Sequence, residues 1–365
     1  MRIAQIIDSL EAGGAERMAV NYANALSKKI PFSGLIVSRK EGLLLSQIDK
    51  KVSYLFVNKK KRIDFGAIFR LRKYLKKNQV EVIHAHSSSF FIAVLVKLTL
   101  PKIEIIWHDH YGISQDLSAR KNVVLKFSSF FFAGIISVNS ALKDWAKSYL
   151  WCSNIVYFPN FIVDAISNEK QILKGSAGKK IICVANLRPQ KNHDLLIDAA
   201  SLISKKFPDW TFHLLGKDFE DLYSERLKKK VKDLKLEETV FFYGSASNVS
   251  DALKQGQIAV LSSLSEGLPL AVLEYGSYKL PVVATKVGEI SKIITSDKEG
   301  LLVPSNNVAE FVQAIEKLIL NEKTREELAL NLYNNIGLNF SENTIISDYI
   351  LWLQSLITFA VKKQK

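Results

Sequence analysis

The sequence predicts an α/β protein with two Rossmann-like, doubly wound domains that face a central cleft. Apolar runs of strand length alternate with longer amphipathic stretches, which is typical of βαβ units in a parallel sheet. This alternation stops at a polar segment, residues 165–180, and then starts again. The chain of 365 residues is also too long for one ordinary hydrophobic core. We therefore expect one domain over residues 1–165 and a second over residues 180–343.

The first domain is expected to begin with a strand and then a helix, residues 15–26, in which Met18, Tyr22 and Leu26 recur at helical spacing. Apolar runs predict its strands at residues 3–7, 34–38, 80–84, 103–107, 133–138 and 155–158. Two further helices are expected in this domain, at residues 63–77 and 90–100.

The second domain repeats the pattern, with strands expected at residues 181–185, 211–215, 240–243, 258–261 and 281–284. Its helices are expected at residues 195–205, 222–234, 271–277, 308–320 and 325–332. The last segment, residues 344–365, is amphipathic and predicts a long helix. This helix either packs on one of the two domains or lies on a membrane. If it packs on a domain, we expect that domain to be the N-terminal one.

Charge is distributed unevenly along the chain. The formal net charge is +14, and residues 1–165 carry +12 of it. Such asymmetry favours an anionic partner for the first domain: nucleic acid, an anionic membrane or a phosphorylated substrate, with plain solubility as the alternative. The only two cysteines lie far apart, which excludes a disulfide scaffold. Because no apolar run has the length of a signal-peptide core or a membrane span, we expect a cytoplasmic protein.

Two glycines, Gly13 and Gly14, stand between the first strand and the first helix. A glycine loop lets the backbone approach a ligand, and the helix N-terminus behind it favours an anion such as phosphate. The alternative is a tight turn with no ligand. The loop is neither the dinucleotide fingerprint nor a P-loop.

Four histidines lie at or just beyond the ends of two expected strands of the first domain: His84, His86, His108 and His110. Histidines gathered at strand ends suggest a metal site. We prefer a polar edge of an active site, with one histidine touching the substrate and no metal, because no cysteine or glutamate-rich motif accompanies them.

Arg188 and Lys191 follow the first strand of the second domain. A guanidinium and an ammonium three residues apart at a strand end can neutralise a diphosphate. The alternative is a solvated basic loop.

Glu266 and Glu274 are eight residues apart, in the order Glu266-Gly267-Leu268-Pro269 and then an expected helix. This spacing places Glu274 about two helical turns beyond Glu266. The backbone N–H groups of Gly267 and Leu268 suit phosphate, while the carboxylates suit sugar hydroxyls. An incidental pair of glutamates is the alternative.

Taken together, these motifs resemble the retaining glycosyltransferases of family 4, also called glycosyl transferases group 1, which have the GT-B fold. The resemblance extends along the whole chain and includes Gly244 and the run Gly300-Leu301-Leu302-Val303-Pro304. It implies a nucleotide-sugar donor, a UDP-sugar by default, and no cofactor or metal. Two positions depart from the family: Asn186-Leu187 precedes the basic pair where Gly-Arg is common, and Glu289 follows Gly288 where a second glycine is common.

The resemblance also assigns roles. It implies that Arg188 and Lys191 bind the donor diphosphate, that Glu274 binds the ribose and that Glu266 contacts the transferred sugar. His108 is expected near the reacting centre, with His110 as the alternative. Further donor contacts are expected from Gly13, Gly14, Gly244, Gly267 and Leu268, and acceptor contacts from His86 and His110.

The basic first domain is expected to meet a saccharide acceptor, which we take to be linked to a lipid diphosphate. The run Lys59-Lys60-Lys61-Arg62, the basic helix after it and the aromatic run at residues 127–132 suggest peripheral binding at the inner face of the cytoplasmic membrane. Such an enzyme would serve bacterial surface polysaccharide biosynthesis (O-antigen, capsule or exopolysaccharide). The alternatives are a scaffold of the same fold without catalysis that binds nucleic acid or membrane, and another GT-B enzyme such as an epimerase. The sequence contains no recognisable DNA-binding or RNA-binding module, so we expect no nucleic-acid partner.

Overall fold

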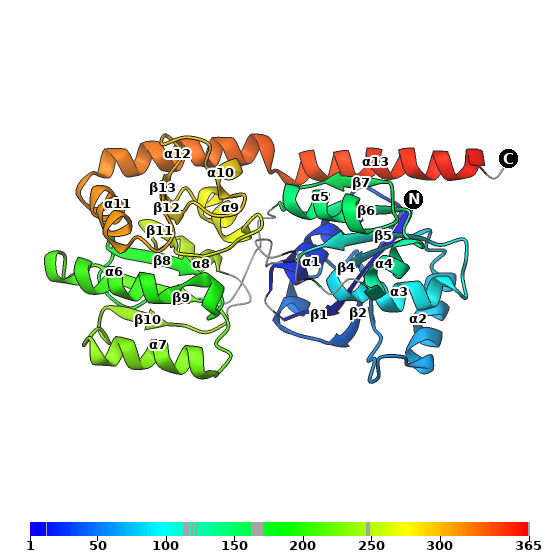
Figure 1. Ribbon diagram of the computed structural model, residues 1–365, viewed down its shortest axis with the longest axis horizontal. Coiled ribbons are helices and arrows are strands. Elements are labelled where there is room, and N and C mark those ends of the chain that lie inside the picture. The colour runs from blue at the N-terminus through cyan, green and yellow to red at the C-terminus, as the bar shows by residue number, and fades with distance from the viewer. Residues whose placement is uncertain are drawn as a thin grey trace. The chain divides into compact units, whose positions relative to one another are not determined.

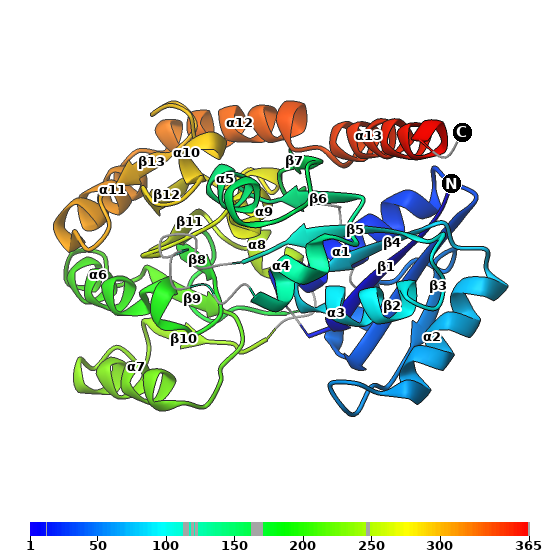
Figure 2. The ribbon, with the colours of Figure 1, turned by 45° about the vertical axis from the view of Figure 1, so that its right-hand side comes forward.

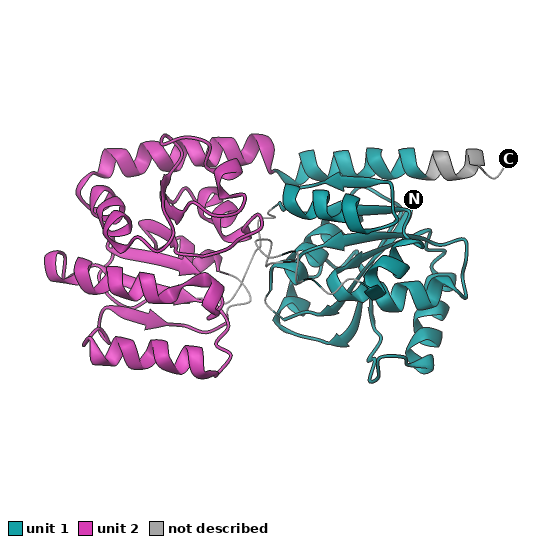
Figure 3. Cartoon of the chain, in the orientation of Figure 1, with its two compact units in different colours: residues 1–163, 341–365 teal, residues 164–340 magenta. Residues whose placement is uncertain are grey.

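A computed structural model of the chain describes residues 1–11, 13–111, 117, 120, 123–161, 171–245 and 249–363, with side chains as far as residue 356. The chain forms two compact units, coloured separately in Figure 3. Unit 1 comprises residues 1–163 and 341–365, and unit 2 comprises residues 164–340. No helix of the described part is long and apolar enough to cross a membrane.

Unit 1 contains a seven-stranded parallel sheet in the order β3-β2-β1-β4-β5-β6-β7. The order reverses between β1 and β4, as in doubly wound folds, where ligands bind at the carboxyl ends of the strands. The strands are β1 (Arg2–Ser9), β2 (Phe32–Lys40), β3 (Ser53–Phe56), β4 (Val82–His86), β5 (Glu104–Asp109), β6 (Gly134–Ser137) and β7 (Ile155–Tyr157).

Helices cover both faces of this sheet (Figures 1 and 2). The helices α2, α3 and α4 contact one another in sequence on one face, and α1 and α13 pack together on the other. Their bounds are α1 (Gly14–Ser27), η1 (Leu43–Gln47), α2 (Phe65–Lys77), η2 (Ser87–Ser89), α3 (Phe90–Lys97), α4 (Val123–Ser129), α5 (Ser140–Tyr149) and α13 (Glu342–Lys363).

The two faces of the central strands differ in chemistry. Alternate residues of β4 and β5, such as Ile83 and Trp107, enter an apolar core. The residues between them, His84 and His108, lie on the opposite face, beneath α1 and α13, and are also almost completely buried. A strand directs successive side chains to opposite faces, so one strand supplies both surfaces.

Unit 2 contains a six-stranded parallel sheet in the order β10-β9-β8-β11-β12-β13. Its strands are β8 (Lys180–Val184), β9 (Thr211–Leu215), β10 (Val240–Phe242), β11 (Ile258–Leu261), β12 (Val282–Thr285) and β13 (Leu301–Val303). Its helices are η3 (Pro189–Lys191), α6 (His193–Lys206), α7 (Leu222–Asp233), α8 (Ser250–Leu253), α9 (Leu270–Ser277), α10 (Ile290–Ile293), α11 (Val308–Leu320) and α12 (Glu322–Asn339).

The predicted α/β class with two parallel-sheet domains is confirmed. The short strands β3 and β13 and the helices α4, α5, α8 and α10 were not predicted. The strands β3 and β13 have four and three residues, so a two-residue alternation cannot be recognised in them. The helix α5 is half polar and is marked mainly by its cap, in which the Asn139 side chain accepts a hydrogen bond from the Leu142 N–H. Most of the polar segment at 165–180 lies outside the described residues.

Candidate active site

Three loops of unit 2 meet at the carboxyl ends of β8, β11 and β12. The Leu264 N–H donates to the Gln190 carbonyl (2.8 Å), and the Ser262 hydroxyl donates to the Lys191 carbonyl (2.9 Å). The Glu289 N–H donates to the Gly267 carbonyl (3.0 Å). These bonds bring the predicted basic pair and the predicted Glu266-Gly267-Leu268 segment to one edge of the sheet.

Lys191 and Glu266 form an ion pair at this edge. The Lys191 Nζ lies 2.6 Å from Glu266 Oε1, and the same oxygen accepts a hydrogen bond from the Ser263 hydroxyl at 2.6 Å. The Glu266 side chain is 7% exposed and that of Lys191 22%. A carboxylate buried to this extent needs a charged partner, because desolvation penalises an isolated ion. Thus the residue expected to bind diphosphate also neutralises the residue expected to bind sugar.

The loop after β12 fits closely over this pair. Gly288 has φ of +56°, and a Cβ at this position would lie 2.0 Å from the Glu266 carbonyl oxygen. Only glycine combines this conformation with such a close approach. The next residue, Glu289, forms an ion pair with Lys292 at 2.7 Å. The departure from a second glycine therefore places a carboxylate in this loop.

Arg188 is exposed, and its guanidinium lies over the Phe219 ring, 4.3 Å from the centroid. The ring supports the cation through its π face while the guanidinium hydrogen-bond donors remain accessible. An extended backbone at Arg188 and a left-handed one at Asn192 (φ of +48°) set the direction of the loop between β8 and α6.

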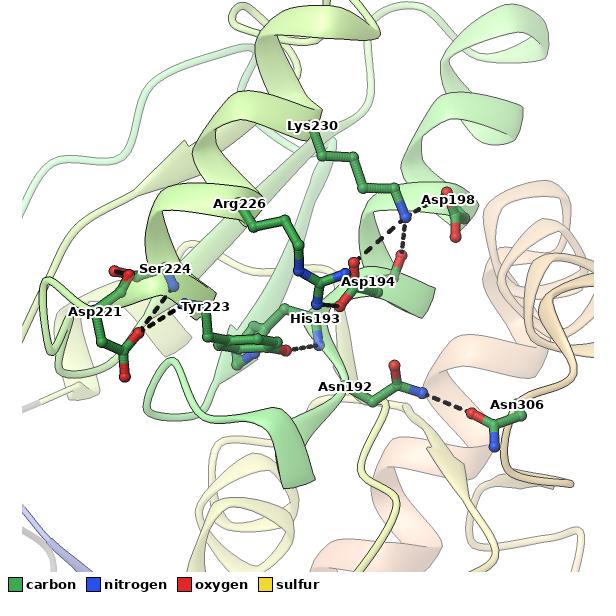
Figure 4. A network of polar contacts seen from close by, with 10 residues as sticks. All are labelled: Asn192, His193, Asp194, Asp198, Asp221, Tyr223, Ser224, Arg226, Lys230 and Asn306. Atoms are coloured by element: carbon green, nitrogen blue, oxygen red, sulfur yellow. Dashed lines mark hydrogen bonds and ion pairs between the residues drawn. The ribbon is translucent and has the colours of Figure 1, made fainter.

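A polar network holds the segment that follows Lys191 (Figure 4). The His193 N–H donates to the Tyr223 hydroxyl (3.1 Å), and Asn192 Nδ2 donates to Asn306 Oδ1 (3.1 Å). Around these contacts, acidic residues of α6 pair with basic residues of α7, in the pairs Asp194–Arg226 (2.6 Å) and Asp198–Lys230 (2.7 Å). The network fixes α6 against α7 and therefore fixes the loop that carries Lys191.

Glu274 lies on α9 and is half-buried. Because α9 begins at Leu270, Glu266 lies before the helix and the two glutamates do not share a helical face. The helix is fixed by the Tyr275 hydroxyl, which accepts from the Val184 N–H (2.6 Å) and donates to the Val260 carbonyl (3.2 Å). Gly244 has φ of +69° and its carbonyl accepts from the Gly216 N–H at 2.8 Å.

In unit 1, the predicted Gly13-Gly14 loop carries a carboxylate at the N-terminus of α1. Gly13 is the N-cap residue, and a Cβ there would lie 2.3 Å from Glu16 Oε2. The Ser9 hydroxyl donates to Glu16 Oε1 at 3.3 Å. Burial raises the pKa of Glu16 from its usual value. The chain's own carboxylate thus lies at the helix end where the sequence analysis expects an anion.

The four predicted histidines form a hydrogen-bonded ladder across β4 and β5. His84 Nε2 lies 3.1 Å from His108 Nδ1, and His86 Nδ1 lies 3.0 Å from His110 Nε2. At the far end of the first pair, the Tyr349 hydroxyl of α13 lies 3.1 Å from His84 Nδ1. Burial lowers the pKa of all four, to about 3 for His110, so the imidazoles are neutral.

Neutral imidazole is the form of histidine that binds a metal ion, so the geometry of these rings bears on the metal hypothesis. One nitrogen from each of His84, His86 and His108 lies within 4.8 Å of the others. However, the His84 ring stacks on the His86 ring with an interplanar angle of 21° and on the His108 ring with 15°. The rings of these neighbouring histidines therefore lie nearly parallel to each other. Nitrogens of the same rings form the hydrogen bonds of the ladder, which a bound metal would have to replace.

A cleft of about 360 Å³ lies at the carboxyl ends of β4 and β5. His110 lines it, whereas His108 is 1% exposed and His86 is fully buried. The lining residues are Ser87, Ser88, Phe90, Trp107, Asp109, His110, Tyr111, Arg120, Val124 and Leu125.

Asp109 and Arg120 form a bidentate pair in this cleft, with N···O distances of 2.7 and 2.9 Å, which the sequence did not predict. The Arg120 guanidinium also lies 4.4 Å from the Tyr111 ring centroid and 4.2 Å from that of Trp145. Burial raises the pKa of Asp109, and Arg120 partly offsets this effect. Aromatic rings and planar charged groups are suited to a sugar, because they present apolar faces beside fixed hydrogen-bonding groups.

Comparisons with known proteins agree with this arrangement. The family model for Glycosyltransferase Family 4 matches residues 12–165, and the model for Glycosyl transferases group 1 matches residues 164–335. An uncharacterized glycosyltransferase of Haemophilus influenzae is 28% identical, over 85% of this chain and 88% of that protein. The UDP-Gal:alpha-D-GlcNAc-diphosphoundecaprenol alpha-1,3-galactosyltransferase of Escherichia coli is 25% identical over 90% of each chain.

Solved structures share the fold. Anabaena HepE, crystallised in complex with UDP and glucose, has a TM-score of 0.79 at 16% identity and covers 97% of this chain and 100% of its own. Since the two family models follow each other along the chain and the fold matches from end to end, this chain is a glycosyltransferase of the GT-B fold and belongs to family 4, the glycosyl transferases group 1.

Proposed function

We propose that this chain is a retaining, metal-independent glycosyltransferase that transfers a sugar from a UDP-sugar to a saccharide carried on a lipid diphosphate. The observation that carries the proposal is the Lys191–Glu266 pair at the meeting point of three unit 2 loops. The proposed donor follows the names of the E. coli relative and of the HepE complex, which contain UDP-Gal and UDP. The proposed acceptor follows the E. coli relative and a Campylobacter jejuni relative that is 25% identical, both of which are named for undecaprenol-linked diphosphates.

In the proposed reaction, the bond between the sugar C1 and the β-phosphate oxygen breaks and the acceptor hydroxyl oxygen forms the new bond to C1. The acceptor proton passes to the departing diphosphate, on the same face of the sugar. Negative charge grows on that diphosphate, where the Lys191 ammonium and the Arg188 guanidinium stabilise it. No metal ion is required for this charge balance.

The remaining donor contacts are assigned as the family resemblance implies. Glu266 accepts hydrogen bonds from hydroxyls of the transferred sugar, and Glu274 accepts them from the ribose. Gly267, Leu268, Gly244, Gly13 and Gly14 contribute backbone contacts. Of the histidines, His110 lies on an accessible cleft, so we assign it the contact to sugar ahead of His108.

The proposal is tested with purified protein, EDTA and a panel of UDP-, GDP- and ADP-sugars. A lipid-diphosphate-linked monosaccharide serves as the acceptor, and the anomeric configuration of the product is read by NMR. We expect turnover of a UDP-sugar with retention. A product with inverted configuration overturns the retaining assignment, and loss of activity in EDTA overturns metal independence. Absence of donor binding across the whole panel would favour the scaffold alternative.

We further propose that unit 1 binds an anionic membrane surface. A cytoplasmic enzyme of surface polysaccharide synthesis would meet its lipid-linked acceptor there. On α2, Phe65 is 81% exposed and Phe69 64% exposed, one helical turn apart, among lysines and arginines. Cations near anionic lipid contribute about 1 kcal/mol each, and exposed aromatic rings add apolar insertion. Leu71 of the same helix is buried in the unit 1 core.

Liposome co-sedimentation tests the membrane proposal. The double variant Phe65→Ser/Phe69→Ser should bind anionic vesicles less than the parent at low salt, whereas a control variant at an exposed leucine of unit 2, Leu330→Ser, should bind like the parent. Failure of the parent to bind would overturn the membrane proposal without touching the enzymatic one.

A further inference from the structure

Three cations gather at the carboxyl edge of the unit 1 sheet, on a different set of strands from the cleft at β4 and β5. Arg39 lies at the end of β2, and Lys59 and Arg62 lie in the loop after β3. The Lys59 N–H donates to the Ser38 carbonyl at 2.7 Å, which extends the pairing of β3 with β2 and directs the loop along the sheet edge. We call these three residues the basic cluster.

Lys59 is buried without a matching anion. It is 6% exposed, and no carboxylate of the described residues lies within 4 Å of its ammonium. The Lys59 ammonium and the Arg62 guanidinium both lie over the Phe91 ring, at 5.8 and 5.5 Å from its centroid. Burial, and then the neighbouring Arg39, lower the pKa of Lys59. A buried ammonium among like charges is unfavourable unless a ligand compensates it.

The two nearest carboxylates already have other partners. Asp8 accepts hydrogen bonds from the hydroxyls of Ser38 and Ser88 and lies 3.7 Å from Arg39. Asp64 caps α2, accepting from the Ala67 N–H (2.9 Å) and the Lys60 N–H (3.0 Å). The basic cluster therefore keeps an excess of positive charge at a ligand-binding edge of the sheet.

The basic cluster adjoins the cleft that His110 lines. Ser88 belongs to the lining of that cleft, and its hydroxyl donates to Asp8 at 2.6 Å, so one residue connects the two. Asp8 in turn lies 3.7 Å from Arg39, so the cleft and the basic cluster share neighbouring side chains. A diphosphate carries at least two negative charges, and a guanidinium and an ammonium match it as a fork and a point charge.

We propose that Arg39, Lys59 and Arg62 bind the diphosphate that links the acceptor sugar to its lipid. This inference rests on the proposed function and names the acceptor group that unit 1 recognises. The chemistry recognised is a diphosphate monoester or diester. Free pyrophosphate has the same diphosphate group and would bind the same residues. The lipid tail is not part of the proposed site.

Steady-state kinetics with two soluble acceptors test the assignment. One carries the acceptor sugar on a short-chain alkyl diphosphate, and the other is the neutral alkyl glycoside of the same sugar. We expect Lys59→Met and Arg62→Gln each to raise KM for the diphosphate acceptor by roughly tenfold or more. The KM for the neutral glycoside and the rate of donor hydrolysis should stay at the parent values.

The matched control is Lys147→Met, which removes an exposed lysine of α5 and changes the net charge equally. Its kinetics with both acceptors should match those of the parent. Equal KM increases for both acceptors in Lys59→Met would overturn the diphosphate assignment, as would no increase for either. A parent that glycosylates neither acceptor would count against the proposed function instead.

A binding measurement tests the diphosphate site independently of catalytic turnover. Isothermal titration of the UDP-saturated protein with inorganic pyrophosphate, and then with the alkyl diphosphate, should detect a site that Lys59→Met weakens by about tenfold and Lys147→Met does not. Equal weakening for both ligands supports recognition of the diphosphate alone. Unchanged affinity in Lys59→Met, or no binding by the parent, overturns the proposal even if the enzyme is active.

Discussion

At the scale of single residues, the Lys191–Glu266 pair combines two demands. Glu266 is 7% exposed and pairs with Lys191, and in the proposed reaction the same ammonium also binds the donor diphosphate. One ammonium can serve both, since it has three N–H donors and only one of them is needed at 2.6 Å from Glu266. The Ser263 hydroxyl donates to the same carboxylate oxygen at 2.6 Å, so this oxygen has a second hydrogen bond besides that from Lys191.

Replacement of Lys191 should therefore impair catalysis and stability together. We expect Lys191→Ala to lower kcat/KM for the donor by on the order of 100-fold, because a charge that stabilises the leaving diphosphate is lost. It should also lower the free energy of unfolding by about 3 kcal/mol, since Glu266 is left as an unpaired buried carboxylate. Donor-hydrolysis kinetics and urea unfolding measure the two effects.

The control for this variant is Lys206→Ala, which removes a 63% exposed lysine paired with Glu316. Exposed pairs contribute about 0–1 kcal/mol, so this variant should behave like the parent. Kinetics of Lys191→Ala that match the parent would remove the role assigned to its ammonium.

Gly288 gives a second prediction at this scale. We expect Gly288→Ala to displace the Glu266 loop, because its φ of +56° and the Glu266 carbonyl oxygen 2.0 Å from a Cβ leave no room for a methyl group. The variant should lose donor affinity and be destabilised by about 2 kcal/mol or more. The control, Gly337→Ala in α12, has nothing within 4 Å of its Cβ and should be stabilised by up to about 1 kcal/mol. A Gly288→Ala variant with parental melting temperature and donor affinity would contradict the steric account.

At the scale of elements, α13 shows how a segment from the end of the chain completes a domain. Ile346, Tyr349 and Leu353 are at most 1% exposed in unit 1. The Lys28 ammonium lies 3.5 Å from Glu342 at the start of the helix. The apolar spacing predicted the helix, but only the fold supplies the surface that it covers. That surface carries the polar histidine ladder, which the Tyr349 hydroxyl reaches.

This contact makes Tyr349→Phe a precise test of how α13 is attached. Loss of the hydroxyl leaves His84 Nδ1 without its partner in a fully buried site, so unit 1 should be destabilised by roughly 1–3 kcal/mol. Tyr149→Phe is the matched control, because Tyr149 is 47% exposed on α5 in the same unit. Urea unfolding measures both variants. Equal stabilities would mean that the Tyr349 hydroxyl does not contribute to the attachment of α13.

At the scale of the whole molecule, all six histidines have pKa values below the ordinary value for the side chain, because each is buried. The folded protein keeps them neutral down to pH values of about 3 for His110 and about 4 for His193 and His213. The unfolded chain binds protons on these side chains from about pH 6.5 downwards. Below that pH the unfolded state therefore holds more protons, and stability falls as the pH falls.

We expect the free energy of unfolding to be nearly constant between pH 7 and pH 8 and to decrease from pH 6.5 to pH 5. The slope should be on the order of 1.4 kcal/mol per pH unit for each histidine that stays neutral in the folded state. Unit 1 holds four of the six histidines and four of the five tryptophans, so tryptophan fluorescence follows mainly the unit expected to lose more. Unfolding curves that coincide at pH 7.5 and pH 5.5 would contradict the prediction.

The sequence alone determined the αβ alternation, the two parallel sheets and the motifs at the strand ends. The alternation and the sheets follow from the spacing of apolar residues, which is a local property of the sequence. The motifs could be recognised because ligands bind at the carboxyl ends of parallel strands. Thus Arg188, Lys191 and Glu266 were recognised before their contacts were known.

Only the tertiary structure decided which of these residues touch, and which of several similar residues is accessible. The sequence could not pair Lys191 with Glu266 across 75 positions, nor Tyr349 with His84 across 265. It ranked His108 ahead of His110, whereas His108 lies within β5 beneath α1 and α13 and is 1% exposed, and His110 follows the end of β5 and lines the cleft. The missing information was the burial and partner of each polar group, which arise from packing between distant segments rather than from the order of residues.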